Sequence, residues 1–103
     1  NPVAAMLLTY HDPIFWPDVP PNKAGFIHKL SVMHDYQGKG VADQMVNFAK
    51  NEVKNKGIPW LRLDCHSDRT RLRNFYERLG FRCVREGIAD GHPTAFYEIG
   101  IYR

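Results

Sequence analysis

The segment His34–Lys50, HDYQGKGVADQMVNFAK, joins a glycine-containing turn directly to an amphipathic helix. After Gln37-Gly38-Lys39-Gly40, apolar residues recur at helical spacing: Ala42, Met45, Val46, Ala49 and Val53. Gly57 and Pro59 mark the end of this helix. Backbone N–H groups at such a turn, together with the positive end of the helix dipole, attract an anion. The sequence therefore predicts a phosphate site where the helix begins.

Three phosphate-binding patterns compete for this turn. A Walker loop needs Gly-Lys-Ser/Thr, but Gly38-Lys39 is followed by Gly40. A dinucleotide fingerprint needs a third glycine where this chain has Asp43, whose carboxylate would repel a pyrophosphate. The pattern Arg/Gln-x-x-Gly-x-Gly/Ala is matched in full by Gln37–Ala42. A glycine turn that only starts a helix would look the same in isolation.

The flanking sequence predicts an α/β protein in the order β-β-α-β-α-β-β, a mixed β-sheet with flanking helices. The strands are expected at Ala4–Tyr10, Ala24–Met33, Trp60–Cys65, Phe81–Glu86 and Thr94–Tyr102. His11–Asn22 contains four prolines and is expected to be a loop. Strict alternation in Ala24–Met33 would put Phe26, His28, Leu30 and Val32 on one face.

The second helix is predicted from the apolar stripe of Leu72, Phe75, Tyr76 and Leu79, with Gly80 ending it. Ser67 or Asp68 is the expected N-terminal cap. The turn Asp90-Gly91-His92-Pro93 predicts that the last two strands form a hairpin.

Two motifs in this order resemble the GCN5-related N-acetyltransferase (GNAT) superfamily. Leu30-Ser31-Val32 precedes Gln37–Ala42, and Leu72–Phe81 contains a sequence similar to the family's YE-x-x-GF signature. The resemblance covers residues 4–103 and implies one domain, residues 1–103, with the acyl-CoA N-acyltransferase fold. The family's usual N-terminal strand and two helices have no counterpart here, so we expect an N-terminally truncated domain.

The resemblance implies acetyl transfer from acetyl-CoA to an amine by direct attack on the thioester. No metal is expected, because the spacing of His28, His34, Cys65 and His66 matches no zinc signature. The alternative is a non-catalytic module, or an inactive fragment, that binds CoA or acyl-CoA. The backbone of Leu30, Ser31 and Val32 would pair with pantetheine, as the free edge of a strand splayed from its neighbour. The pyrophosphate would bind at Gln37, Gly38, Lys39, Gly40, Val41 and Ala42.

Two side chains are expected to move protons. Tyr76 corresponds to the family tyrosine that protonates the leaving thiolate, although its spacing alone also fits a core aromatic residue. His28 is the expected general base because histidine side chains titrate near neutral pH; a partly buried structural histidine is the alternative. Asp64 and His66 could instead relay a proton through water. Arg69 stands where the family often has a pantetheine-binding asparagine, so either Asp68 replaces that contact or Arg69 reaches a coenzyme phosphate.

Composition agrees with a small globular domain. The 103 residues carry a net charge of +3, which favours anionic ligands without indicating nucleic acid. The arginines at 69, 71, 73, 78 and 82 are expected to form mainly a solvated face, from which one or two could contact the phosphates of the coenzyme. Cys65 and Cys83 fit reduced thiols in a cytoplasmic protein. No membrane partner is expected, whereas apolar surface at the missing elements would favour a homodimer. The amine acceptor cannot be identified from these residues.

Overall fold

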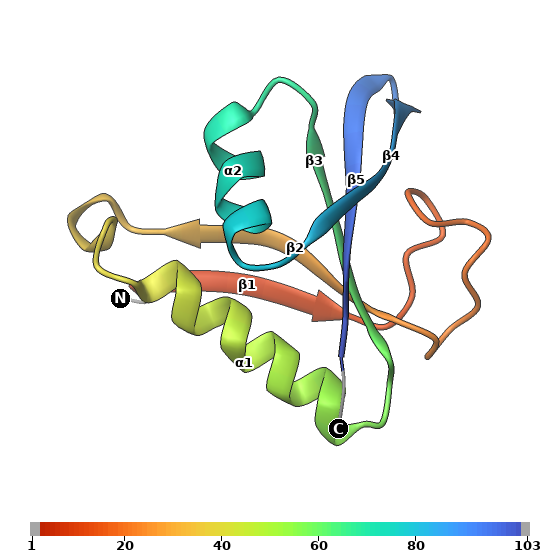
Figure 1. The fold of residues 1–103 in the computed structure, drawn as a ribbon, viewed down its shortest axis with the longest axis horizontal. Coiled ribbons are helices and arrows are strands. Elements are labelled where there is room, and N and C mark those ends of the chain that lie inside the picture. Colours follow the sequence, from red (N-terminus) through yellow and green to blue (C-terminus); the bar gives the residue numbers. More distant parts are fainter. Residues whose placement is uncertain (1–2, 102–103) are drawn as a thin grey trace.

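The computed structural model describes residues 3–101, which form a five-stranded sheet and two α-helices (Figure 1). In chain order these are β1 (Ala4–Thr9), β2 (Gly25–Val32), a 3₁₀ turn (His34–Tyr36), α1 (Val41–Asn55), β3 (Trp60–His66), α2 (Thr70–Arg78), β4 (Arg82–Ala89) and β5 (His92–Gly100). The sheet order is β1-β2-β3-β5-β4, in which only β2 and β3 run parallel. The predicted mixed α/β fold and element order are confirmed. Tyr102, placed in the last strand from sequence, lies outside the described residues.

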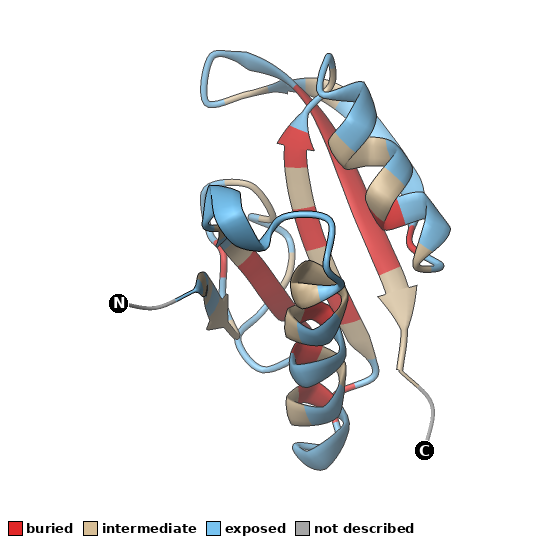
Figure 2. Cartoon of the chain, turned by 90° about the vertical axis from the view of Figure 1, so that its left-hand side faces the viewer, coloured by how far each residue is buried: buried red, intermediate tan, exposed pale blue. Residues whose placement is uncertain are grey.

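Both helices cover the same face of the sheet, and the main core lies between them and the strands. Val46, Ala49 and Val53 of α1 and Tyr76 of α2 are buried in one apolar cluster with Leu61 and other strand residues. Figure 2 shows this burial concentrated in the central strands and on the inner side of α1. At Gly25 a β-carbon would lie 2.5 Å from Val53 Cγ2, so only glycine allows this close approach of β2 to α1.

The opposite face is partly covered by the proline-rich loop between β1 and β2. Trp16 of this loop packs on Phe26 and Phe96, with ring centroids 6.0 and 5.4 Å apart. Arg62 stacks between Trp16 and Trp60, 5.1 and 5.3 Å from their ring centroids. The loop therefore forms a second, smaller aromatic core on the side without helices.

A β-bulge in β2 overturns the predicted face of His28. Three steps along β2, from His28 to Ser31, oppose only two along β1, from Leu7 to Ala5. Lys29 takes up the extra residue with φ of 55°. Strict alternation would put His28 and Leu30 together, but the bulge turns Leu30 toward the helix-side cluster that also contains Ile27. His28 instead joins the loop side, so the prediction that it shares a face with Leu30 and Val32 was wrong.

The two ends of α2 and the final hairpin complete the frame of the site. Arg69 occupies the N-cap position of α2, and no side chain caps that end, so the prediction that Ser67 or Asp68 does so was wrong. The β4–β5 hairpin is confirmed, with its turn at Asp90 and Gly91, whose φ angles are 48° and 79°. Within residues 3–101, neither helix is long and apolar enough to cross a membrane.

Candidate active site

The parallel strands β2 and β3 separate soon after they meet. They pair only at Gly25–Leu61 and Phe26–Arg62, although β2 continues to Val32 and β3 to His66. On its other edge, β3 pairs with β5 along its whole length. The predicted splay of the Leu30-Ser31-Val32 segment from its neighbouring strand is therefore present.

A groove follows this splay from the glycine turn to the interior of the sheet. It consists of three adjoining hollows of about 450, 510 and 530 Å³. Val32, Gln37, Ala42 and Phe75 are shared by the outer and middle hollows, and Leu30, Arg69 and Leu72 by the middle and inner hollows. The groove thus has two walls: β2 with the following turn and α1 on one side, and α2 on the other.

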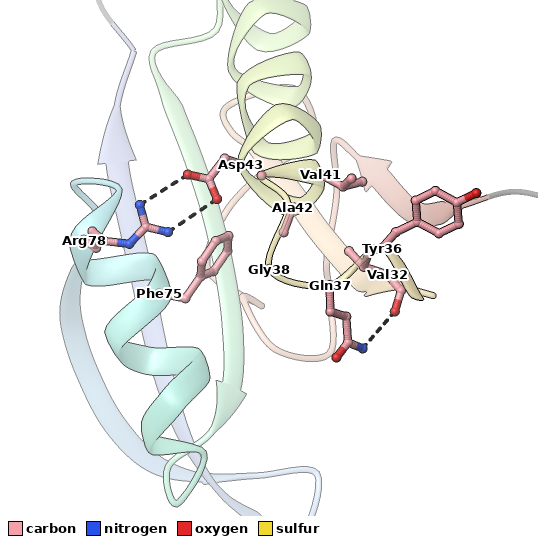
Figure 3. A pocket seen from close by; sticks show the side chains of 10 residues that line it. Val32, Tyr36, Gln37, Gly38, Val41, Ala42, Asp43, Phe75 and Arg78 are labelled. Atoms are coloured by element: carbon pink, nitrogen blue, oxygen red, sulfur yellow. Dashed lines mark hydrogen bonds and ion pairs between the residues drawn. The ribbon is translucent and has the colours of Figure 1, made fainter. Parts of the chain in front are cut away.

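The outer end of the groove is an open turn in front of α1. Gly38 and Gly40 have φ of 77° and 80°, and a β-carbon at either would meet no atom within 4 Å. No side chain caps α1, so the N–H groups of its first turn remain available to an anion. Gln37 Nε2 donates a hydrogen bond to the Val32 carbonyl at 3.0 Å, which ties the turn to the end of β2 (Figure 3). These residues fit a pyrophosphate-bearing ligand.

An ion pair joins the two walls at this outer end. Both terminal nitrogens of the Arg78 guanidinium donate hydrogen bonds to Asp43 in the first turn of α1, at 3.2 and 3.3 Å. Phe75 points from α2 toward the glycine turn (Figure 3). Asp43 is the residue whose presence excludes a dinucleotide fingerprint, and in the structure it forms an ion pair with Arg78 at this end of the groove.

Two basic residues assigned to the coenzyme lie in different places. Arg69 lines the middle and inner hollows, whereas Lys39 lines none of the three and lies 6.0 Å from the Tyr36 ring centroid. Arg71, grouped from sequence with the arginines of the solvated face, lines the middle hollow beside Ser31. The positive charge along the groove is thus contributed mainly by α2 and its N-terminus.

Tyr76 lines the inner hollow and is 4% exposed. Its ring packs at centroid distances of 5.6 Å from Phe81 and 6.4 Å from Tyr97. Burial raises the pKa of Tyr76 to about 12, with smaller contributions from Cys65 and Asp64. The hydroxyl therefore keeps its proton at neutral pH and can act as a hydrogen-bond donor.

His28 lines the same hollow and is held from the loop side. Its Nε2 lies 3.0 Å from Thr9 Oγ1 and 3.9 Å from Asp12 Oδ2. Asp12 is only 6% exposed; its Oδ1 accepts the Phe15 N–H, and its Oδ2 has no hydrogen-bond partner in the described chain. Neither Thr9 nor Asp12 was identified from sequence, because both precede the motifs and no spacing connects them to His28.

Asp64 also lines the inner hollow. Burial, and to a smaller extent the charge of Asp12, raise the pKa of Asp64 to about 6. A carboxyl group with this pKa can accept a proton near neutral pH, which agrees with the proton-relay alternative. His66 also reaches the hollow, but its ring stacks on His92 at 4.8 Å.

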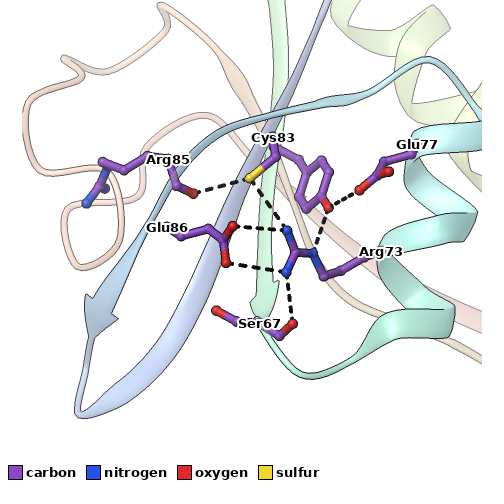
Figure 4. A network of polar contacts seen from close by, with 7 residues as sticks. Ser67, Arg73, Glu77, Cys83, Arg85 and Glu86 are labelled. Atoms are coloured by element: carbon purple, nitrogen blue, oxygen red, sulfur yellow. Dashed lines mark hydrogen bonds and ion pairs between the residues drawn. The ribbon is translucent and has the colours of Figure 1, made fainter.

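The Arg73 side chain anchors α2 to the sheet. Its guanidinium donates to Tyr97 Oη and to the Ser67 carbonyl, both at 2.9 Å, and pairs with Glu86 at 3.3 Å (Figure 4). Tyr97 in turn donates to Glu77 at 2.5 Å. The hydrogen bond to Tyr97 is the main reason why the pKa of Arg73 is raised. Sequence periodicity assigned Arg73 to a solvated face, and only the tertiary structure shows this network.

Comparison with known proteins agrees with the geometry. Residues 1–81 match the sequence pattern of the acetyltransferase (GNAT) family. N-alpha-acetyltransferase 30 of Schizosaccharomyces pombe is 33% identical over 57 residues, which cover 55% of this chain and 38% of that protein. YesJ of Bacillus subtilis, named an uncharacterized N-acetyltransferase, is 27% identical over 81 residues, 79% of this chain and 45% of that protein.

Solved structures share the fold. A GNAT-family acetyltransferase of Listeria monocytogenes has a TM-score of 0.77 at 26% identity, covering 95% of this chain and 57% of that chain. Ard1 of Thermoplasma volcanium has a TM-score of 0.79 at 12% identity, covering 98% and 64% respectively, and supports the fold alone. The matched region is less than half the length of the two curated relatives.

Proposed function

Because this chain belongs to the GNAT acetyltransferase family, we propose that it transfers an acetyl group from acetyl-CoA to an amine acceptor. The observation that carries the proposal is the groove between β2 and α2, which connects an open, uncapped helix start to a buried tyrosine. In this proposal the phosphate end of the donor lies at the helix start and its thioester end lies near the tyrosine. Acyl transfer is the family chemistry; the acetyl donor and the direct mechanism are part of the proposal.

The donor would be held mainly by backbone groups. Pyrophosphate would lie against the Gln37–Ala42 turn, where Gly38 and Gly40 leave room for close approach. Pantetheine would pair with the β2 edge at Leu30, Ser31 and Val32, which lacks a β3 partner. The bulge also leaves Lys29 and Leu30 without a register partner on β1. A backbone N–H in this stretch would donate to the thioester oxygen as negative charge develops there.

The amine must lose a proton before it attacks, because free alkylamines titrate near pH 10. We assign this first proton to His28, from which it passes to solvent, with Asp64 as the alternative acceptor. The neutral amine then attacks the carbonyl, so the new C–N bond forms and the C–S bond breaks. A second proton leaves nitrogen as the amide forms, and one proton ends on the sulfur of CoA.

Tyr76 would stabilise the leaving thiolate. A phenol with a pKa of about 12 does not readily give its proton to a thiolate of pKa about 8.5. A hydrogen bond from the Tyr76 hydroxyl to the developing thiolate needs no such proton transfer. The sulfur can gain its proton later, as the amide nitrogen loses one. Because its pKa is raised, Tyr76 would donate a hydrogen bond to the thiolate in the transition state without giving up its proton fully.

The competing proposal is a module that binds CoA or acyl-CoA without turnover. Incubation of the chain with acetyl-CoA and a panel of small amines, polyamines and peptide N-termini separates the two, with release of the CoA thiol as the readout. Thiol release that depends on the amine supports the transferase. Calorimetric binding of CoA without release for any acceptor supports the binding module.

Three further properties are proposals. A cytoplasmic location fits the unpaired thiols of Cys65 and Cys83. A homodimer fits the exposed apolar side chains of edge strand β1 and its N-terminal flank, with Leu7 49% and Val3 39% exposed, and sedimentation would test it. The acceptor is an amine of unspecified class; we propose no role for nucleic acid or for a membrane partner.

A further inference from the structure

We propose that Thr9 and Asp12 position His28 for proton transfer: Thr9 sets which ring nitrogen is open to the acceptor, and Asp12 stabilises the protonated ring. The proposal rests on the proposed acetyl transfer, for which His28 is the base. It concerns residues on β1 and on the loop that covers the helix-free face. No family motif found in the sequence includes either residue.

The hydrogen bonds around Thr9 determine the tautomer of His28. The Thr9 hydroxyl has one hydrogen and points toward the His11 carbonyl at 3.4 Å. Its oxygen lies 3.0 Å from His28 Nε2, so this arrangement favours a hydrogen on Nε2 that is donated to Thr9. Nδ1 then holds the lone pair. Within residues 3–101, Nδ1 has no hydrogen-bond partner and is not sealed from solvent, so it is open to an incoming proton.

Asp12 lies where it can stabilise a positive ring. Its Oδ2 is 3.9 Å from Nε2, in a residue that is 6% exposed, and this oxygen lacks any hydrogen-bond partner in the described structure. A buried, unpaired carboxylate oxygen is unfavourable unless a positive partner forms nearby. An imidazolium at His28 is such a partner. When Nδ1 takes a proton from the acceptor ammonium, the new charge lies between Asp12 and the groove.

Other charged groups also face His28, and the test must account for them. Asp64 approaches from β3, and Arg69, from the N-terminus of α2, lines the same hollow. His66 and Tyr76 complete its ionisable lining together with Cys65 and Lys29. Among the described residues, only Asp12 combines close approach to Nε2 with an unpartnered buried oxygen, which makes its contribution separable by substitution.

The test uses matched variants of the whole chain. Asp12→Asn removes the charge but keeps an oxygen for the Phe15 N–H, and Asp18→Asn makes the same change at an exposed position of the same loop. Thr9→Val removes the hydroxyl at nearly constant shape, and Thr9→Ser restores it. The measurements are the pH profile of kcat/KM and the nitrogen NMR shifts of the His28 ring.

We expect Asp12→Asn to lower the plateau of kcat/KM about 10-fold and to move its acidic limb about one unit toward lower pH. Asp18→Asn should change neither. NMR should show hydrogen on Nε2 in the wild type, a mixture in Thr9→Val and recovery in Thr9→Ser. The NMR result does not depend on turnover, so it separates this inference from the proposed function.

Two results would overturn the inference. One is a wild-type His28 with its hydrogen on Nδ1. The other is an Asp12→Asn profile that superimposes on that of the wild type in an active enzyme, which would leave the acetyl transfer intact but remove Asp12 from it. If the wild type shows no amine-dependent turnover, the proposed function fails and the NMR result alone decides the tautomer.

Discussion

The two walls of the groove are built in different ways. The wall formed by β2, the glycine turn and the start of α1 has few side-chain bonds, and its turn depends on two glycines with φ near 80°. The α2 wall is fixed by side chains: Arg73 bonds to groups on β4, on β5 and in the loop before α2, and Tyr76 packs among aromatic rings. One wall therefore offers backbone groups to a ligand, and the other offers side-chain chemistry.

This difference indicates how each wall responds to substitution. On the glycine wall, an added side chain fills the space that the ligand needs, although the protein itself has room for it. On the α2 wall, a lost side chain removes either a hydrogen-bond donor or a structural anchor. The two walls are best distinguished by variants that change only ligand binding, only turnover or only stability.

The largest effect is expected from Gly40→Glu on the glycine wall. The new side chain would enter the open turn with a negative charge, so affinity for CoA should fall by at least about 100-fold, measured by calorimetry. Gly91→Glu is the matched control, since Gly91 has almost the same φ, 79°, and equally open surroundings in the β4–β5 turn. Both variants carry the same backbone strain, of about 1–2 kcal/mol. Equal CoA affinity in both would show that the turn does not hold the phosphate.

Tyr76→Phe tests the chemical role of the α2 wall. The ring should stay in its aromatic cluster, so stability should change by no more than about 1 kcal/mol. Turnover should fall roughly 100-fold if the hydroxyl stabilises the thiolate, while CoA affinity should stay within a factor of about 2. Tyr10→Phe serves as a control for loss of a hydroxyl from a tyrosine outside the groove. A Tyr76→Phe variant with wild-type kcat would assign Tyr76 to the core alone.

The same two walls show how much could be predicted from sequence. The glycine turn, the helix after it and the YE-x-x-GF region are local patterns, so their residues and order followed from the chain itself. The face of His28 was missed because one extra residue at Lys29 reverses the alternation, and nothing in that stretch marks a bulge. Arg73 and Asp12 were missed for a related reason. Their partners lie on distant segments, and an arginine or aspartate at an ordinary position shows no sign of a tertiary bond.

Arg73→Lys should weaken the fold more than the chemistry. Lysine cannot reproduce the fork that reaches Tyr97, the Ser67 carbonyl and Glu86 at once. We expect the free energy of unfolding in urea to fall by about 1–3 kcal/mol for the lost charged hydrogen bonds. Arg71→Lys, an exposed change on the same helix, should stay within about 0.5 kcal/mol. An unchanged urea midpoint for Arg73→Lys would mean that aromatic packing alone holds α2.

The smallest effect, and the most specific to pH, is expected at Asp64, which lies between the walls. Burial and the charge of Asp12 raise the pKa of Asp64 to about 6, so the folded chain binds this proton more tightly than the unfolded chain, in which an aspartate titrates near pH 4. Ionisation of Asp64 therefore destabilises the fold as pH rises from about 4 to about 6, and the full penalty persists above that range. Asp64→Asn removes the charge and should raise Tm by roughly 2–5 °C at pH 7.5, but not at pH 4.

Asp68→Asn, an exposed change just beyond the same strand, should show no such dependence on pH. A gain of equal size at both pH values would point to altered hydrogen bonding in place of ionisation. Loss of turnover together with the gain at pH 7.5 would show that this carboxylate is kept ionisable for catalysis at the expense of stability.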